Sequence, residues 1–126
     1  MSNISHKDFA CLLNIKEAID KIYDYTADHS DPDSFNNDSK SFDAVMMNFV
    51  VIGEMSEKLS DEFRTETIKE IDWFKKRCFR NIIAHNYFGI DAEEVWQIIK
   101  NSLSDLEKRS VKLLINKPHT RNKRYM

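Results

Sequence analysis

The sequence predicts an all-α helical bundle, and three observations carry that prediction. Only 2 of the 126 residues are glycine and 2 are proline, far below average usage of roughly 7% and 5%, so few residues suit the tight turns of a sandwich or barrel. Apolar residues recur at steps of three and four along several segments, which is the period of an amphipathic helix. No segment convincingly predicts a strand. The length fits one domain, since most domains hold about 100–150 residues.

The first expected helix runs from Ser5 to about Ala27. Its apolar stripe consists of Phe9, Leu12, Leu13, Ile15, Ile19, Ile22 and Tyr23. Ser5, followed three residues later by Asp8, suits an N-cap with an acid in the first turn. The next run, Asp28–Ser41, is rich in Asp, Asn and Ser, whose side chains compete with the helix backbone for hydrogen bonds. We expect a long solvated loop there; its acids could bind a cation, but their spacing fits no known ligand loop.

The second expected helix runs from about Phe42 to Leu59. Its stripe consists of Phe42, Val45, Met46, Phe49, Ile52, Met55 and Leu59. Gly53 lies in the middle of this helix, where glycine costs about 1 kcal/mol relative to alanine. A glycine at that position indicates the close approach of another helix or chain. Ser60 then caps a short third helix that ends near Ile68.

Two more helices complete the expected bundle, Trp73–Tyr87 and Ala92–Ile115. Asp72 and Asp91 are placed to cap them, because a side-chain oxygen before the first turn accepts from free backbone N–H groups. The stripe of the fifth helix consists of Val95, Trp96, Ile99, Leu103, Leu106, Val111 and Leu114. Pro118 prevents the helix from continuing.

The net charge of −2 conceals an asymmetry along the chain. The last ten residues, Lys117–Met126, hold four basic residues and no acidic one, whereas the rest holds 15 basic and 21 acidic residues, a net charge of −6. We therefore divide the chain into a single helical domain, residues 1–116, and a basic tail, residues 117–126. The tail is expected to provide an auxiliary contact to a partner.

The two cysteines, Cys11 and Cys78, show neither metal-ligand spacing nor a disulfide framework. We expect two reduced core thiols in a cytoplasmic protein. The N-terminus lacks the apolar core of a secretory signal, and no stretch approaches the ~18 apolar residues of a membrane span.

The segment Trp73–Ile90 contains no acidic residue. Its four cations are Lys75, Lys76, Arg77 and Arg80. In an acidic chain they form a positive field suited to a phosphate-bearing partner. Charge alone does not decide this, because the solvent face of an ordinary helix carries similar residues.

The geometry of an ideal helix adds a constraint on this segment. At about 100° per residue, Arg80 and Tyr87 project almost together, whereas His85 lies about 140° from Arg80. The side facing the core is expected to hold Phe79, Ile82 and Ile83. For Arg80 and His85 to converge, either the helix loosens before Gly89 or the groups come from two copies of the chain in a symmetric dimer.

Arg80 and His85 suit RNA cleavage that uses no metal or cofactor. Attack of the RNA 2′-hydroxyl on the neighbouring phosphate needs proton transfer near neutral pH, which imidazole supplies. It also needs a fixed cation for the charge that builds on the phosphate, which guanidinium supplies. Supporting groups that could orient the phosphate or the imidazole are Asn81 and Asn86. Spacing by itself is weak support, because Arg and His five residues apart occur often by chance.

A family resemblance adds specific support. The run Arg80–Tyr87 matches the Arg-x4-His-x-Tyr signature of HEPN domains, and the run Tyr87–Asp91 resembles the continuation found in the HepT branch. Two runs of the second helix, Ile52–Glu54 and Leu59–Ser60, resemble the family's Ile-Gly-Glu and Leu-Ser positions. Ile71–Trp73 resembles the family's Ile-Pro-Trp, with Asp in place of Pro.

The resemblance covers roughly Phe42 to Leu114 and implies an all-α HEPN-type homodimer. In such proteins the residues matching Arg80 and His85 line a cleft between protomers and cut RNA. HepT-like proteins are toxins of toxin–antitoxin modules, encoded beside an MntA-like nucleotidyltransferase. That antitoxin neutralises the toxin by transferring AMP to the tyrosine of the motif, here Tyr87. The resemblance implies no metal and no cofactor.

Glu54 lies on a mostly apolar helix, and the first turn of the motif has an unusual composition. We expect Glu54 to hold the Arg80 guanidinium in place as a structural partner rather than to act catalytically. Residues 74–79 are rich in Phe, Lys and Cys, where relatives commonly have small apolar residues and Met, so the substrate preference stays open. The main alternative is a catalytically silent HEPN binding subunit of a nucleotidyltransferase complex. The ordered motifs argue against a third alternative, a plain interaction bundle.

Overall fold

Three long helices and a C-terminal helical rod build the molecule. The computed structural model describes residues 4–115. The long helices are α1 (His6–Thr26), α3 (Ser39–Lys58) and α5 (Trp73–His85). The rod is continuous and consists of α6 (Ala92–Gln97), the π turn η2 (Ile98–Ser102) and α7 (Leu103–Leu114). Shorter elements are α2 (Pro32–Asn37), α4 (Asp61–Thr67) and the 3₁₀ turn η1 (Tyr87–Gly89). All five expected helices are therefore present.

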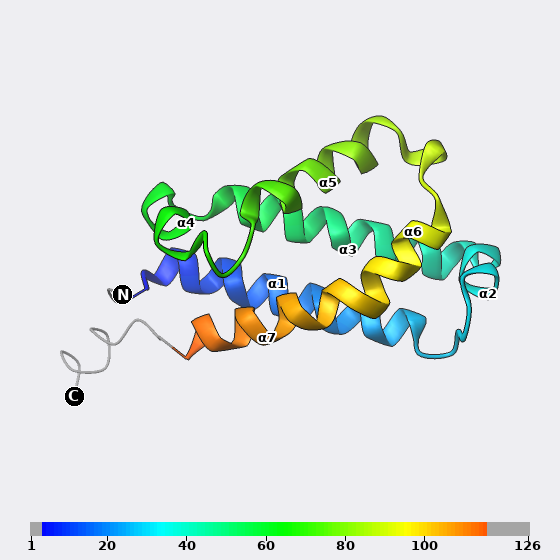
Figure 1. Cartoon of the computed structure of the whole chain (residues 1–126), viewed down its shortest axis with the longest axis horizontal. Helices are drawn as coiled ribbons and strands as arrows, with labels where there is room; N and C mark the ends of the chain where they lie inside the picture. The colour runs from blue at the N-terminus through cyan, green and yellow to red at the C-terminus, as the bar shows by residue number, and fades with distance from the viewer. Residues whose placement is uncertain (1–3, 116–126) are drawn as a thin grey trace.

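The long helices pack in a chain of neighbours. In Figure 1, α1 lies between α3 and α7, and α5 runs along the far side of α3. The core lies mainly between α1, α3 and the rod, and the largest of its fully buried aliphatic side chains are Leu12, Ile15, Ile19, Ile22, Met46, Ile99, Leu103 and Leu113. The expected stripes thus form the core, except that Leu13 and Val111 are exposed.

The expected N-caps all form. Side-chain oxygens of Ser5, Ser60, Asp72 and Asp91 accept hydrogen bonds from backbone N–H groups in the first turns of α1, α4, α5 and α6. Asp8 has a further role, because its side chain is buried and accepts from the backbone N–H and the hydroxyl of Ser60, at 2.8 and 2.7 Å. This contact ties the start of α1 to the start of α4.

The expectation of a long solvated loop at Asp28–Ser41 is wrong, because the run contains α2 and the first turn of α3. Asp31 caps α2 through the N–H of Ser34, and proline follows it at the first helical position, where a missing N–H costs nothing. Phe35 is fully buried and packs against the rings of Phe42 and Trp96. That burial fixes the segment, since a single apolar anchor can outweigh weak helix propensity.

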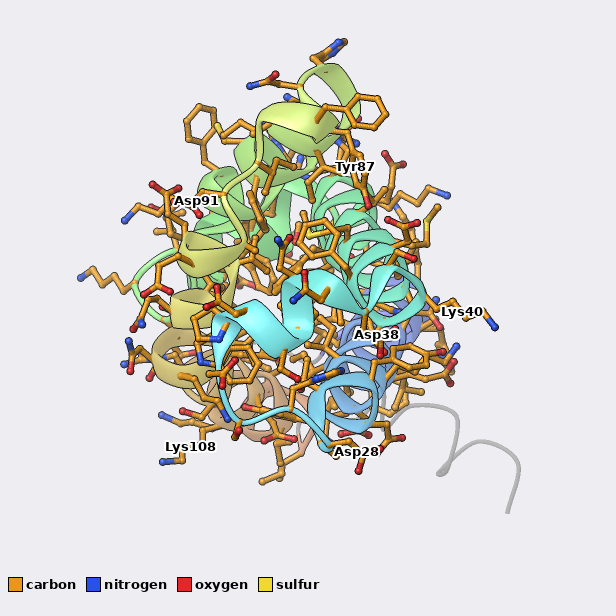
Figure 2. The ribbon with its side chains drawn as sticks, turned by 90° about the vertical axis from the view of Figure 1, so that its right-hand side faces the viewer. Asp28, Asp38, Lys40, Tyr87, Asp91 and Lys108 are labelled. Atoms are coloured by element: carbon orange, nitrogen blue, oxygen red, sulfur yellow. The ribbon has the colours of Figure 1, made fainter. Side chains whose placement is uncertain are left out.

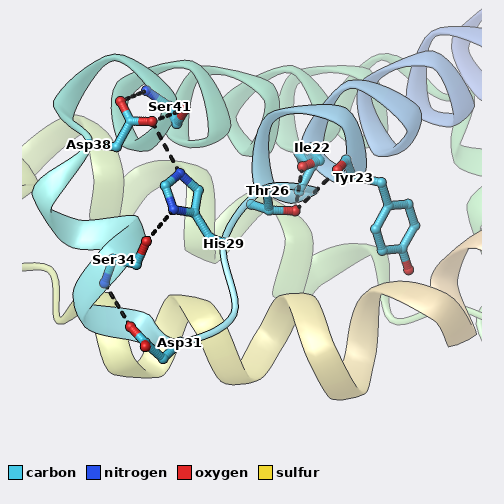
Figure 3. A network of polar contacts seen from close by, with 8 residues as sticks. All are labelled: Ile22, Tyr23, Thr26, His29, Asp31, Ser34, Asp38 and Ser41. Carbon is cyan, nitrogen blue, oxygen red and sulfur yellow. Dashed lines mark hydrogen bonds and ion pairs between the residues drawn. The ribbon is translucent and has the colours of Figure 1, made fainter.

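A histidine joins α2 to α3 (Figure 3). The His29 ring lies with Nδ1 2.6 Å from the Ser34 hydroxyl and Nε2 3.1 Å from the Asp38 carboxylate. Asp38 in turn caps α3 by accepting from the backbone N–H and hydroxyl of Ser41. Two of the four acids of this run, Asp31 and Asp38, therefore serve as caps, and within residues 4–115 no group of three or more metal-ligating side chains forms.

Gly53 allows α3 and α5 to approach closely, as the sequence predicted. A Cβ atom at Gly53 would lie 2.4 Å from the Cβ of Arg80 and 2.8 Å from the carbonyl oxygen of Lys76. Both are atoms of the neighbouring helix that cannot rotate away. Glycine is thus required at this position by the backbone of α5.

Three smaller expectations concern the cysteines, membrane spans and the tail. Cys11 is buried and Cys78 is half-buried, and both are free thiols. Across residues 4–115, no helix has both the length and the apolar character to span a membrane. The basic tail lies outside the described residues, and so does Pro118.

Gly53→Ala should lower stability although alanine is the better helix former. The added methyl group has to push α5 away from α3, and we expect a net loss of about 1–3 kcal/mol in the free energy of unfolding. Chemical denaturation with circular dichroism measures this loss. Gly89→Ala is the matched control, because its Cβ would meet only the side-chain end of Asn86, which can rotate. An unchanged or raised stability of Gly53→Ala would contradict the close-approach interpretation.

Candidate active site

The orientation of α5 is set by contacts on both sides of Arg80. Before it, Trp73 is buried and its indole N–H donates to the Thr67 hydroxyl at 2.9 Å. The Phe79 ring packs edge-on against Phe49 of α3, with ring centroids 5.2 Å apart. Beyond Arg80, Ile83 is buried. These contacts, with the close approach at Gly53, turn Arg80 toward α3.

Arg80 is held by two carboxylates of α3. Its two terminal guanidinium nitrogens donate to Glu54 and to Glu57, and its Nε donates to the Asn81 side chain at 2.9 Å. Only 16% of the Arg80 side chain remains exposed. Hydrogen bonds to Glu57 and then to Glu54 raise the pKa of Arg80, and the hydrogen bond from Arg80 lowers the pKa of Glu57. The expected pair between Glu54 and Arg80 is confirmed.

Sequence reasoning missed Glu57. The signal was present, because residues three apart on a helix share a face, and Glu57 is three residues beyond Glu54 on α3. Two carboxylates fix the guanidinium but also more than balance its charge. A phosphate that reaches Arg80 therefore has to displace one of them, and Glu57 is the more exposed of the two, at 53% against 44% for Glu54.

The other cations of α5 contribute less free charge than the sequence suggested. Lys76 is half-buried, and burial lowers its pKa. The Arg77 guanidinium lies over the exposed ring of Phe74, 5.7 Å from its centroid. Lys75 is exposed. The positive field around the segment is therefore moderated by burial and by the acids of α3.

His85 is the last residue of α5 and is exposed. Within residues 4–115 its imidazole has no hydrogen-bond or ion-pair partner. Asn86 ends the helix, and its backbone N–H donates to the Ile82 carbonyl at 2.8 Å. The imidazole is therefore accessible from solvent, whereas Asn81 contacts Arg80 and Asn86 ends the helix.

Tyr87 does not project with Arg80, so that expectation is wrong. The regular helix stops at His85, and Asn86 has φ −146° and ψ 46°, which redirects the chain. The Tyr87 hydroxyl instead donates to Asp43 near the start of α3. Since α3 rises about 1.5 Å per residue, Asp43 and Glu54 are separated by about 16 Å along the helix. Figure 2 shows Tyr87 at one edge of the molecule, opposite Asp28 and Lys108.

Arg80 and His85 are not brought together within one chain. The helix stays regular from Trp73 to His85, so the two side chains keep their separation of about 140° around its axis. The helix does loosen before Gly89, but only from Asn86 onward, so the loosening does not turn His85 toward Arg80. Ile82 was also expected to face the core, but 51% of it is exposed, because the buried side of α5 runs through Phe79 and Ile83.

Large apolar side chains are exposed around the same region. They are Met47 of α3, Phe74 and Ile82 of α5, and Phe88 of η1, of which Phe88 is fully exposed. A shallow groove between α3 and the end of α5 is lined by Asp43, Met46, Met47, Val50, Ile83 and Tyr87. Large apolar side chains left exposed along α5 and its neighbours are typical of a surface that contacts another molecule.

An all-α bundle that presents an Arg-x4-His-x-Tyr segment on the end of one helix and the turn after it is a HEPN-type fold. Residues 15–113 match the family model described as "Ribonuclease HepT-like". The chain belongs to this HepT-like family and is a ribonuclease.

Several relatives from archaea are similar to the chain. A "Probable ribonuclease HepT" of Thermococcus cleftensis is 33% identical over 109 residues, which cover 86% of this chain and 96% of the relative. A "Putative RNase MJ1380" of Methanocaldococcus jannaschii is 32% identical over 99 residues, which cover 79% of this chain and 89% of the relative.

A third relative is longer than this chain. It is the "Gamma-glutamylcyclotransferase and putative RNase MJ0434" of Methanocaldococcus jannaschii. The two sequences are 32% identical over 120 residues. The match covers 94% of this chain but only 53% of the relative, so the chain spans about half the length of that protein. The search of solved structures found no significant match.

Proposed function

We propose that this ribonuclease is a metal-independent endoribonuclease toxin that acts as a homodimer. The proposal rests on the contrast between two side chains of α5, one held in place and one exposed. Arg80 is fixed against α3 by Glu54 and Glu57, whereas His85 is exposed and unpartnered within the described residues. Since one chain does not unite them, the Arg80 of one copy works with the His85 of the other. The exposed apolar side chains around α5 support a second copy on this side.

The proposed reaction needs only these groups and the RNA. His85 accepts the proton of the 2′-hydroxyl, whose oxygen attacks the adjacent phosphorus. The bond from phosphorus to the 5′-oxygen breaks, and the imidazolium formed in the first step gives its proton to that leaving oxygen. Arg80 balances the charge on the phosphate oxygens, after the phosphate has displaced Glu57. Glu54 keeps the guanidinium in position, and Asn81 supports it through Nε.

We further propose that a cognate MntA-like nucleotidyltransferase, acting as antitoxin, silences the protein by transferring AMP to Tyr87. The phenolic oxygen attacks the α-phosphorus of ATP, pyrophosphate leaves, and the phenolic proton is lost. Tyr87 is two residues beyond His85, so a bulky anion placed there lies beside the imidazole. The charge would oppose the entry of an RNA phosphate.

A catalytically silent binding subunit of a nucleotidyltransferase complex is the second candidate. The observation that favours it is the neutralisation of Arg80 by two carboxylates. Such a subunit would keep the fold and the dimer but cut no RNA, so one assay separates the two candidates.

Purified protein should cleave total RNA in the presence of EDTA. Arg80→Ala and His85→Ala should each slow cleavage by at least about 100-fold, because each removes a group that acts in the transition state. Gel analysis of the RNA and circular dichroism of each variant measure activity and folding. Lys21→Ala and His6→Ala, both exposed residues of α1, are the matched controls and should stay active. Undiminished cleavage by either site variant would refute the assignment, and no cleavage by the wild type would favour the silent subunit.

Incubation with the cognate nucleotidyltransferase and ATP should raise the intact mass by one adenylate or a multiple of it. Tandem mass spectrometry should place the added mass on Tyr87, and RNA cleavage should fall in parallel. Tyr87→Phe should take up no adenylate, whereas Tyr25→Phe should be modified like the wild type. A mass that never shifts, or a modification on another residue, would contradict this part of the proposal.

A further inference from the structure

The turn that follows His85 is anchored to α3 by Tyr87. The Tyr87 hydroxyl donates to the Asp43 carboxylate, and its ring packs edge-on against Phe42, with ring centroids 6.0 Å apart. Within the turn, the N–H of Gly89 donates to the Asn86 carbonyl and the N–H of Ile90 donates to the Tyr87 carbonyl, at 3.0 and 3.2 Å. Phe88 is fully exposed. Tyr87 therefore fastens the start of this turn to the bundle, and Ile90, which packs against the core, fastens its end.

We propose that the hydrogen bond from Tyr87 to Asp43 is a latch that positions His85, and that any group added to the Tyr87 hydroxyl opens the latch. Asp43 is thus a positioning residue for RNA cleavage, although it lies on another helix and touches no reacting atom. The inference rests on the proposed function, in which His85 transfers protons and Tyr87 is modified. It adds a partner residue and a cause of inactivation.

The latch reaches His85 through a very short stretch of chain. Only Asn86 separates His85 from Tyr87, and two residues span at most about 7 Å. His85 is the last residue of α5, and helix ends fray unless they are fastened. Fixing Tyr87 therefore limits where the imidazole can go. Arg80 is unaffected by the latch, because its own contacts lie about 16 Å further along α3.

A group on the hydroxyl opens the latch for two reasons. The modified oxygen has lost its proton, so it can no longer donate to Asp43. A phosphate on that oxygen also places a negative charge against a carboxylate, and like charges at contact distance repel. The unmodified hydroxyl keeps its proton at neutral pH, since burial and the Asp43 hydrogen bond raise the pKa of Tyr87 to about 12. The latch is therefore closed until the oxygen is modified.

The latch differs from simple blocking of the site in one measurable way. Blocking by an adenylate needs bulk and charge, so removal of the hydroxyl would leave activity intact. A latch needs the donor, so Tyr87→Phe should slow cleavage by about 10- to 100-fold, the range expected for misplacing a catalytic group. Asp43→Ala should slow it equally. Asp43→Asn keeps an acceptor oxygen and should restore most of the rate.

The test is a double-mutant cycle on single-turnover cleavage of an RNA that the wild type cuts. If the hydroxyl and carboxylate act as one latch, Tyr87→Phe combined with Asp43→Ala should be no slower than either single variant. RNA affinity, measured by filter binding, should change less than about twofold in all of them, because Arg80 is untouched. Asp28→Ala, an exposed acid at the opposite edge (Figure 2), is the matched control. Thermal melting confirms that each variant is folded.

Hydrogen exchange supplies a readout that does not depend on RNA. The amides of Gly89 and Ile90 should exchange faster in Tyr87→Phe, in Asp43→Ala and in adenylated protein than in the wild type. The latch is overturned if these amides are unchanged, if the two substitutions add independently, or if both variants cleave like the wild type while His85→Ala is inactive. If the wild type cuts no RNA, or His85→Ala stays active, the proposed function fails and the exchange data still decide whether the latch exists.

Discussion

The close approach of α3 and α5 at Gly53 is the contact on which the rest of the site depends. Because no side chain separates the helices there, the Arg80 Cβ lies against the backbone of α3. The guanidinium must then run along α3, where Glu54 and Glu57 receive it. A wider spacing would leave Arg80 as one more solvated cation. A missing side chain on one helix thus creates a fixed cation on another.

Because α5 runs antiparallel to α3, each end of α3 contacts a different part of the candidate site. Near its C-terminus, Glu54 and Glu57 hold Arg80, and near its N-terminus, Asp43 holds Tyr87 and the turn after His85. In the proposed dimer, each cleft contains the Arg80 end of α3 from one copy and the His85 end from the other copy. Opening the contact between Tyr87 and Asp43 then affects the proton-transfer end while the Arg80 guanidinium stays in place.

Periodicity and capping predicted most of the fold, and local chemistry predicted part of the site. The five helices, their caps and the tight contact at Gly53 depend on residues close in sequence or on one exceptional residue. The pair of Glu54 with Arg80 joins residues 26 positions apart, and it was expected because a carboxylate on a mostly apolar helix often pairs with a cation. The signal for α2 was the Asp31-Pro32 pair with Phe35, but its helical state depends on burial against Phe42 and Trp96. The Tyr87 hydroxyl pairs with a residue 44 positions away, and its direction is set by the backbone of Asn86, so no helical projection could find it.

In the proposed dimer, each active cleft combines Arg80 of one copy with His85 of the other, and mixing two inactive variants tests this arrangement. Arg80→Ala and His85→Ala protein should be co-refolded in equal amounts and assayed on RNA in EDTA. Mixed dimers contain one cleft with both wild-type groups, so about a quarter of the wild-type activity should return if copies pair at random. If the mixture stays as inactive as its components while mixed dimers are detected by native mass spectrometry, the two groups act within one chain and the account is wrong.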